Sequence, residues 1–239
     1  MRVTKMKKLL SVMLFVVFAA ASTPWIFPQT SSQTTPVQGR PDALEQYRRG
    51  RDMEYQNRMR DAEVYYNEAV RICNEEIANN RGTSDSYTVL TWTLRRQQKY
   101  AEAIVWGERG LRLFGNDFRI VQTMGEAYFH QYDYANSLRY MQRYVNSLPQ
   151  GDRASVSYFY MGEAYRLQNK YRLADVAYST ALRLDPSMAL WWYRLGTVRE
   201  NAGESSYAAD AYQRAVRLNP NYNEAINGLA RTRPPAVSQ

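Results

Sequence analysis

Reactive and metal-binding side chains are scarce in this chain of 239 residues. It contains one cysteine and one histidine, so it can form no intramolecular disulfide and offers no cysteine- or histidine-rich site for zinc. It also lacks a glycine-rich phosphate loop after a strand, paired histidines on one helix and the serine turn of hydrolases. The sequence therefore predicts no catalytic residue, no metal site and no cofactor.

Lysine is scarce beyond the first residues of the chain. The formal net charge is +8, and Arg2, Lys5, Lys7 and Lys8 supply half of it. The chain from residue 22 onward has a net charge of +4, and its positive charge is almost entirely arginine interspersed with acids. A protein that binds nucleic acid without sequence preference concentrates its cations on one surface. We therefore expect no nucleic-acid partner.

Residues 1–21 have the organisation of a secretory signal peptide. Four basic residues precede a mostly apolar stretch at residues 9–21, which ends in three alanines. This stretch is shorter than the roughly 20 apolar residues that span a bilayer. We expect cleavage and export to the periplasm or another extracytoplasmic compartment, with no integral membrane span afterwards. The alternative is an uncleaved N-terminal anchor, in which residues 25–27 lengthen the apolar stretch.

Two polar segments flank the centre of the chain. Residues 22–42 are rich in Gln, Thr, Ser and Pro and have no periodicity, which is typical of a flexible linker. Residues 232–239 are expected to form a disordered tail. The folded part of the chain is therefore expected to be residues 43–231.

Proline and glycine recur at a regular spacing within this central part. Three prolines are separated by 37 and 34 residues, and three glycines show the same two spacings: Pro149, Pro186, Pro220, Gly125, Gly162 and Gly196. Self-similarity at this period is typical of helical solenoids.

The clearest repeating unit covers residues 155–186. Each half has apolar and small residues at helical spacing, and a proline stops the second half: Tyr158, Met161, Gly162, Tyr165, Ala174, Tyr178, Ala181, Leu182 and Pro186. In these residues the sequence resembles the tetratricopeptide repeat family, of the bacterial exported type. The resemblance implies an all-α solenoid of helix–turn–helix units that stack into a right-handed superhelix. We expect about five units and a C-terminal capping helix, at approximately residues 43–76, 84–117, 118–151, 155–188, 189–222 and 223–231.

Some positions depart from the family's pattern. Arg199 stands where the first helix of a unit usually carries an aromatic residue. An insertion near residues 77–83 predicts a longer second helix in the first unit. Gly107 and Gly110 lie inside the second helix of the next unit, and each glycine costs a helix about 1 kcal/mol relative to alanine, so this helix is expected to be the weakest.

The resemblance also implies where a partner binds. In this family the first helices line a concave groove, and their non-consensus positions face the ligand. Aromatic residues and arginines are the side chains that most often anchor a partner. The residues expected in the groove are Tyr47, Arg48, Arg51, Trp92, Arg95, Arg96, Gln122, Glu126, Phe129, His130, Phe159, Tyr160, Glu163, Arg166, Tyr193, Arg194, Thr197 and Glu200.

Three functions are compatible with these features. The first is an exported scaffold that binds a protein or peptide segment of an envelope protein in the groove. For this function, alanine at Trp92, Arg95 and Arg96 is expected to abolish capture with little effect on the melting temperature. The second is an assembly factor for an envelope or surface complex, such as pilus or outer-membrane machinery, acting through its convex face or as a homo-oligomer. The third is an enzyme or small-ligand binder. The family's carboxylate-clamp set is not matched.

The single histidine and the single cysteine each have an ordinary interpretation. His130 is expected to lie in solvent or at the edge of the groove rather than to act as a catalytic base. Cys73 is expected to fill apolar space near the end of a helix. The alternative for Cys73 is an intermolecular disulfide in an oxidising compartment.

Overall fold

The computed structural model describes residues 42–232, and every regular element in that range is a helix. The eleven helices are Ala43–Tyr55 (α1), Met59–Ala78 (α2), Ser84–Arg96 (α3), Tyr100–Phe114 (α4), Phe118–His130 (α5), Tyr134–Ser147 (α6), Ala154–Leu167 (α7), Tyr171–Leu184 (α8), Ala189–Asn201 (α9), Ser205–Leu218 (α10) and Asn223–Thr232 (α11). The expected signal peptide, nearly all of the expected linker and the tail from residue 233 lie outside the described residues.

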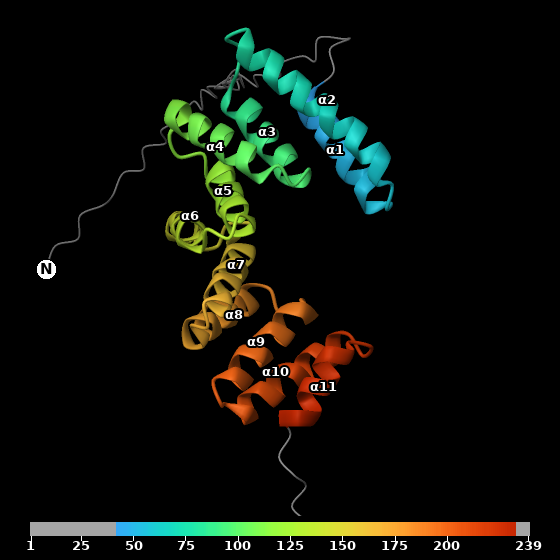
Figure 1. Cartoon of the computed structure of the whole chain (residues 1–239), viewed down its shortest axis with the longest axis vertical. Helices are drawn as coiled ribbons and strands as arrows, with labels where there is room; N and C mark the ends of the chain where they lie inside the picture. The colour runs from blue at the N-terminus through green and yellow to red at the C-terminus, as the bar shows by residue number, and fades with distance from the viewer. Residues whose placement is uncertain (1–41, 233–239) are drawn as a thin grey trace, which may run out of the picture. The chain divides into compact units, whose positions relative to one another are not determined.

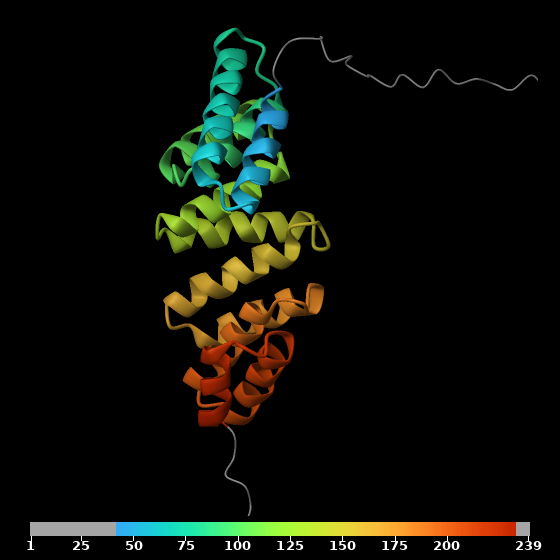
Figure 2. The ribbon, with the colours of Figure 1, turned by 90° about the vertical axis from the view of Figure 1, so that its right-hand side faces the viewer.

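The helices form five helix–turn–helix pairs followed by the single helix α11 (Figures 1 and 2). We call α1, α3, α5, α7 and α9 the first helices, and their partners α2, α4, α6, α8 and α10 the second helices. Each second helix packs against its own first helix and against the first helix that follows. The first helices also contact one another from α1 through α3 and α5 to α7, and α9 contacts α11. This arrangement confirms the expected all-α fold of five repeats and a capping helix.

The turn within each pair uses the same backbone conformation. The second residue after each first helix has a positive φ: Asn57, Gln98, Tyr132, Asn169 and Gly203. The following backbone N–H then donates back into the helix, as that of Lys170 does to the carbonyl oxygen of Tyr165 (2.9 Å). This left-handed C-terminal cap satisfies carbonyls at the end of the helix and allows the chain to reverse within a short turn.

The first pair has a longer second helix, as the insertion in the sequence predicted. Helix α2 is 20 residues long, and residues 79–83 connect it to α3. The side chain of Thr83 accepts a hydrogen bond from the backbone N–H of Ser86, and Ser86 returns the interaction in a capping box. The Ser86 hydroxyl also donates to Glu76 on α2 (2.6 Å). The inserted segment is thus anchored to both helices that it joins.

A glycine in the first helix allows each of the last two pairs to close tightly. A Cβ atom added to Gly162 would lie 2.6 Å from the ring of Tyr178, and one added to Gly196 would lie 2.6 Å from the ring of Tyr212. The glycine at the same position of α5 is Gly125, which faces Met141 instead (2.8 Å). The repeated glycine therefore marks the point where the paired helices approach most closely.

Alanine at Gly162 is expected to destabilise the protein by about 1–3 kcal/mol, because the buried ring of Tyr178 cannot move aside without strain. The measurement is urea unfolding followed by far-UV circular dichroism. Gly125→Ala is the matched control, since it brings the same gain in helix propensity, about 1 kcal/mol, while flexible Met141 can adjust. Equal stability changes in the two variants would contradict this explanation.

Candidate partner-binding site on the first helices

A pocket of about 550 Å³ lies on the side of the array formed by the first helices. It is lined by residues of α1, α3 and α5 and of the end of α6 with the loop that leads to α7. Six of the residues expected in the groove line it: Tyr47, Arg51, Trp92, Arg95, Arg96 and Gln122. Three repeats thus contribute to one site.

The pocket has an aromatic wall. The rings of Tyr47 and Trp92 lie 5.6 Å apart, centre to centre, and Phe118 and Tyr144 contribute further rings to the lining. Tyr47 is buried, and its ring packs against the ring of Trp92. Such a wall can cover an apolar or aromatic side chain of a ligand.

A buried carboxylate lies beside the pocket and joins three repeats. The Glu126 side chain on α5 is 2 % exposed, and it pairs with Arg95 of α3 (Oε2 to Nη1, 3.0 Å) and with Arg153 at the start of α7 (Oε1 to Nη2, 2.8 Å). Gln122 donates to the same carboxylate. Burial by itself would raise the pKa of Glu126, but the two guanidinium groups and this hydrogen bond outweigh it and hold the pKa below its usual value. Glu126 is therefore ionised at neutral pH.

The same kind of ion pair joins every first helix to the next helix of its kind. Besides the two pairs of Glu126, the remaining junctions are bridged by Glu54 with Arg96 (3.3 Å), Glu163 with Arg194 (3.2 Å), and Glu200 with Arg231 of α11 (2.8 Å). We call this series the ion-pair ladder. Much of the arginine on the first helices is therefore engaged inside the chain.

The ladder corrects one expectation from the sequence. Arg95 and Arg96 are not free groove residues, because they neutralise Glu126 and Glu54 in neighbouring helices. Replacing them together with Trp92 would therefore weaken the array as well as the pocket. On this geometry we now expect the triple variant to have a lower melting temperature than the wild type.

The remaining groove candidates fall into two groups outside the pocket lining. Around α5 and α7, the ring centre of Tyr160 lies 5.1 Å from that of Phe129, 6.0 Å from that of Phe159 and 6.1 Å from that of His130. Farther along, the buried carboxylate of Glu163 pairs with Arg166 (2.8 Å) and accepts a hydrogen bond from the hydroxyl of Tyr178. The other members of this second group are Tyr193, whose ring centre lies 5.0 Å from that of Tyr222, and Arg194. They also include Thr197, which donates to the carbonyl oxygen of Tyr193 (3.0 Å), and Glu200, which accepts from the hydroxyl of Tyr212 (2.5 Å).

His130 behaves as an aromatic ring in this environment. It stacks on Tyr100 with a centre-to-centre distance of 4.6 Å. The residue as a whole is exposed, as expected, but partial burial of its ring lowers its pKa, an effect that Glu126 opposes and Arg95 supports. The imidazole is therefore neutral at pH 7 and adds surface to the aromatic cluster.

Two arginines of α1 have different positions. Arg48 and Arg51 are both exposed, but Arg51 lines the pocket and Arg48 does not. Among the acids of residues 42–232, none forms an ion pair with either of them. Arg51 therefore presents an unpaired guanidinium to the pocket.

The sequence interpretation missed the loop that closes one side of the pocket. Arg153, Asp152 and Leu148 line it and were not among the expected groove residues. The loop spans residues 148–153, whereas residues 115–117 connect α4 to α5. The 37-residue spacing between Pro149 and Pro186 was the available signal, since it exceeds the 34-residue spacing of the following unit.

Cys73 lies in the core of the first repeat. It is completely buried, and burial raises the pKa of its thiol to about 12, with smaller contributions from Glu76 and Asp42. The thiolate is the form that reacts in disulfide exchange. This position fits the apolar-filler interpretation, whereas an intermolecular disulfide would require the core to open.

Within residues 42–232, no group of three or more His, Cys, Asp or Glu side chains has the geometry to hold a metal ion. The helices in that range also lack the length and apolar character needed to cross a bilayer.

Comparison with curated proteins gives partial matches. The chain is 33% identical over 104 residues to the probable UDP-N-acetylglucosamine–peptide N-acetylglucosaminyltransferase SPINDLY of Petunia hybrida, which covers 41% of this chain and 11% of that protein. It is 31% identical over 104 residues to the protein of the same name from Solanum lycopersicum, with the same coverage. The chain thus spans about a tenth of the length of these relatives.

Solved structures resemble the array as a whole at low sequence identity. MamA from Desulfovibrio magneticus RS-1 has a TM-score of 0.60 and 18% identity over 77% of this chain and 98% of that one. The Cut9–Hcn1 complex of the APC/C has a TM-score of 0.65 and 18% identity over 80% and 36%. YrrB, described as a TPR protein with an unusual peptide-binding site, has a TM-score of 0.54 and 17% identity over 78% and 91%. These similarities show the fold.

Sequence models of one family match both ends of the array. Two models, each described as tetratricopeptide repeat, match residues 42–115 and residues 161–223. The matched segments contain helices α1–α4 and α8–α10 in full. The chain therefore belongs to the tetratricopeptide repeat family of protein-interaction scaffolds.

Proposed function

We propose that this protein is an exported scaffold that binds a segment of a partner protein in the pocket on its first helices. Tetratricopeptide repeats are generally non-catalytic, and the similar protein YrrB is described as having a peptide-binding site. The observation that carries the proposal is the pocket itself, which combines side chains of three repeats. A segment seated there would contact all three repeats at once.

The charges of the pocket favour an acidic segment. Three exposed arginines line the pocket, Arg51, Arg119 and Arg153, against one exposed acid, Asp152. Arg119 also pairs with the exposed Asp85, and the carboxylate of Glu126 is buried. The side chain of Asp117, which pairs with Arg119, is 9% exposed. A ligand therefore meets arginine N–H donors beside aromatic rings, an arrangement that suits a carboxylate next to an apolar side chain.

The location of the protein outside the cytoplasm is part of the proposal. The basic start and apolar stretch of residues 1–21 support export across the cytoplasmic membrane. The partner is then a protein of the cell envelope. Fractionation of cells, with immunodetection of the chain and of its shortened form, tests this part separately. Recovery of the full-length chain from the cytoplasm alone would overturn it.

Glutamate at Arg51 is expected to weaken partner binding at least tenfold, because it places a negative charge where the pocket offers an unpaired guanidinium. The partner is first captured from the envelope fraction with the wild-type protein. The affinity of its binding segment for the wild type, for Arg51→Glu and for a control variant, Arg48→Glu, is then measured by fluorescence polarisation.

Arg48→Glu is the matched control, since Arg48 lies on the same exposed helix and changes the net charge equally but does not line the pocket. The proposal requires Arg48→Glu to bind nearly as well as the wild type. Equally weakened binding by both variants would indicate general electrostatic attraction. Unchanged binding by Arg51→Glu would exclude this pocket as the binding site of the segment.

A further inference from the structure

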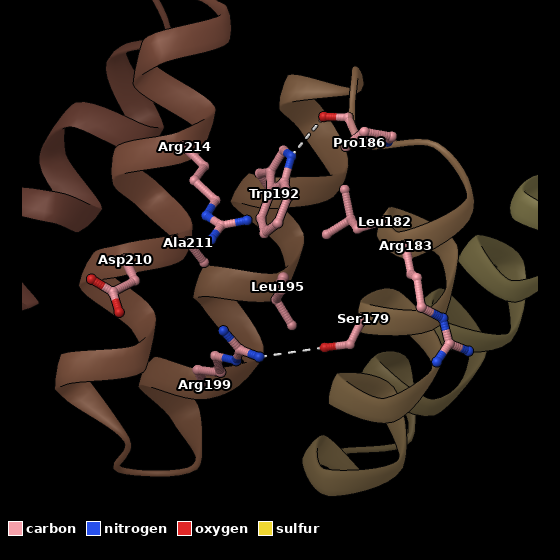
Figure 3. Close-up of a pocket in the computed structure, with 10 residues that line it drawn as sticks. All are labelled: Ser179, Leu182, Arg183, Pro186, Trp192, Leu195, Arg199, Asp210, Ala211 and Arg214. Carbon is pink, nitrogen blue, oxygen red and sulfur yellow. Dashed lines mark hydrogen bonds between the residues drawn. The ribbon is translucent and has the colours of Figure 1, made fainter.

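A second pocket lies between the second helices α8 and α10, beside the first helix α9. It has a volume of about 360 Å³ and is lined by residues of α8, α9 and α10 and by Pro186 in the turn between α8 and α9 (Figure 3). None of its lining residues belongs to the pocket on α1, α3 and α5. Its size is near the lower end of ligand pockets, which run from about 300 to 1,000 Å³. It can therefore hold a large side chain or a short peptide turn.

The pocket contains the position where the sequence departs from its family. Arg199 stands three residues after Gly196, and the residues at the same place in α5 and α7 are Tyr128 and Tyr165, which pack against the core. The guanidinium of Arg199 instead binds Asp175 of α8 (Nε to Oδ2, 2.8 Å). The lining here is therefore a guanidinium group rather than a packed tyrosine ring.

The Arg199 side chain is fully engaged. Besides Asp175, it donates to the hydroxyl of Ser179 (3.3 Å), as Figure 3 shows, and to the carbonyl oxygen of Tyr207 (3.4 Å). It thus joins α8 to the start of α10 and shapes the base of the pocket. Its charge is balanced by Asp175, so the anion-binding capacity of the pocket must come from another residue.

Two other arginines line the pocket, Arg183 and Arg214. Figure 3 shows the guanidinium of Arg183 pointing away from Trp192, so Arg214 provides that capacity beside the indole ring. Its guanidinium lies over the indole ring of Trp192, 4.6 Å from the ring centre, and the indole is held in place by a hydrogen bond from its N–H to the carbonyl oxygen of Pro186 (2.8 Å). Among residues 42–232, no acid forms an ion pair with Arg214. Figure 3 shows the carboxylate of Asp210 turned away from it. A guanidinium stacked on a ring keeps its in-plane N–H groups available for a carboxylate.

The inner surface of the pocket is apolar. Leu182, Leu195 and Ala211 line it and are buried, and Figure 3 shows Leu182 and Leu195 beside Trp192. An anion alone would leave this surface uncovered. A ligand that fits must carry an apolar group next to its negative charge.

We propose that this pocket binds an acidic segment of a partner protein, with a carboxylate on Arg214 and a neighbouring apolar side chain against Trp192, Leu182 and Leu195. The site is independent of the pocket on the first helices. The protein then holds two segments at once and can connect two partners, or two parts of one partner. Two linked binding events raise the effective affinity without any additional contact at either site.

The test is a selection of peptides on the immobilised chain. A display library of random heptapeptides is passed over the Arg51→Glu variant, which removes the principal anion-binding group of the other pocket. We expect enrichment of peptides with Asp or Glu next to Leu, Phe or Trp. A selected peptide is then synthesised, and its affinity is measured by fluorescence polarisation.

Arg214→Glu is expected to weaken the selected peptide at least tenfold. Arg217→Glu is the matched control, because Arg217 is exposed on the same helix and does not line the pocket. Because each replaced side chain is exposed, both variants are expected to fold, and circular dichroism checks this. Enrichment of peptides without acids, no enrichment at all, or equal weakening by the two variants would each overturn the proposal. Retained binding to the Arg51→Glu variant separates this site from the one in the proposed function.

Discussion

Methionine in place of Arg95 is expected to destabilise the helical array by about 3 kcal/mol, because breaking a buried ion pair leaves an uncompensated charge. The buried carboxylate of Glu126 would retain the hydrogen bond from Gln122 and a single guanidinium, that of Arg153, whose side chain is 47% exposed. Methionine keeps much of the apolar stem of arginine, so the change removes mainly the charge and its hydrogen bond. Urea unfolding at pH 7, followed by far-UV circular dichroism and by tryptophan fluorescence, measures the effect.

The pH dependence of this variant identifies the cause. Because the folded protein holds the pKa of Glu126 below its usual value, the stabilisation from this carboxylate is fully present above the pKa of an unfolded glutamate, about 4.3. That stabilisation is lost as the pH falls through the folded-state value. The stability difference between wild type and Arg95→Met is therefore expected to be large at pH 7 and to narrow below about pH 4.

Arg48→Met serves as the control, since Arg48 is exposed on a first helix and outside the ladder. It is expected to change stability by less than about 0.5 kcal/mol, as surface substitutions usually do. A difference for Arg95→Met that stays the same at pH 7 and pH 3.5 would show that lost packing, rather than the ion pair, accounts for it.

Alanine in place of Tyr178 is expected to cost about 3–5 kcal/mol, the range for removing a large aromatic side chain from a packed core. The side chain is completely buried, lies against Gly162 and packs on Phe159 with a ring distance of 5.8 Å. Its hydroxyl donates to Glu163. Burial, followed by the charge of Glu163, raises the pKa of Tyr178, so this hydroxyl stays protonated.

Two further variants separate the contributions of this tyrosine. Tyr178→Phe is expected to lose only about 1 kcal/mol, the usual net value of one hydrogen bond, because Glu163 keeps Arg166 and Arg194. In the Tyr178→Ala background, Gly162→Ala should no longer destabilise, since the ring that it would meet is absent. If the penalty of Gly162→Ala persisted there, the close approach of ring and glycine would not be its cause.

The ion-pair ladder changes what the arginine content of this protein means. Arginine beside aromatic residues indicated a partner-binding surface, yet Arg95, Arg96, Arg166 and Arg194 all have carboxylate partners within the chain. Repeat arrays are stabilised by interactions between nearest neighbours. The ladder supplies such an interaction at every junction of the first helices, and it leaves a smaller set of arginines for ligands.

Much of the fold could be predicted because it depends on local patterns. The positions of Gly162, Ala174 and Tyr178 recur with the period of the repeat, and this period by itself determined the helix pairs, their order and the final capping helix. The longer α2 was also foreseen, since an insertion within one unit is visible in the sequence. Such features follow from helix geometry and from contacts between residues close in the chain.

The partners of the charged residues were decided by the tertiary structure alone. Whether the side chain of Arg95 faces a ligand or Glu126 depends on the position of α5 relative to α3. The loop at residues 148–153 in turn brings Arg153 to the same carboxylate. Arg199 was visible in the sequence as a departure from the family's pattern, but its consequence depends on Asp175, which lies on the preceding helix α8 within 2.8 Å of the guanidinium. The repeat period therefore determined where the helices are. Distances between side chains of different repeats, on which ion pairs and pockets depend, arise only when the helices pack.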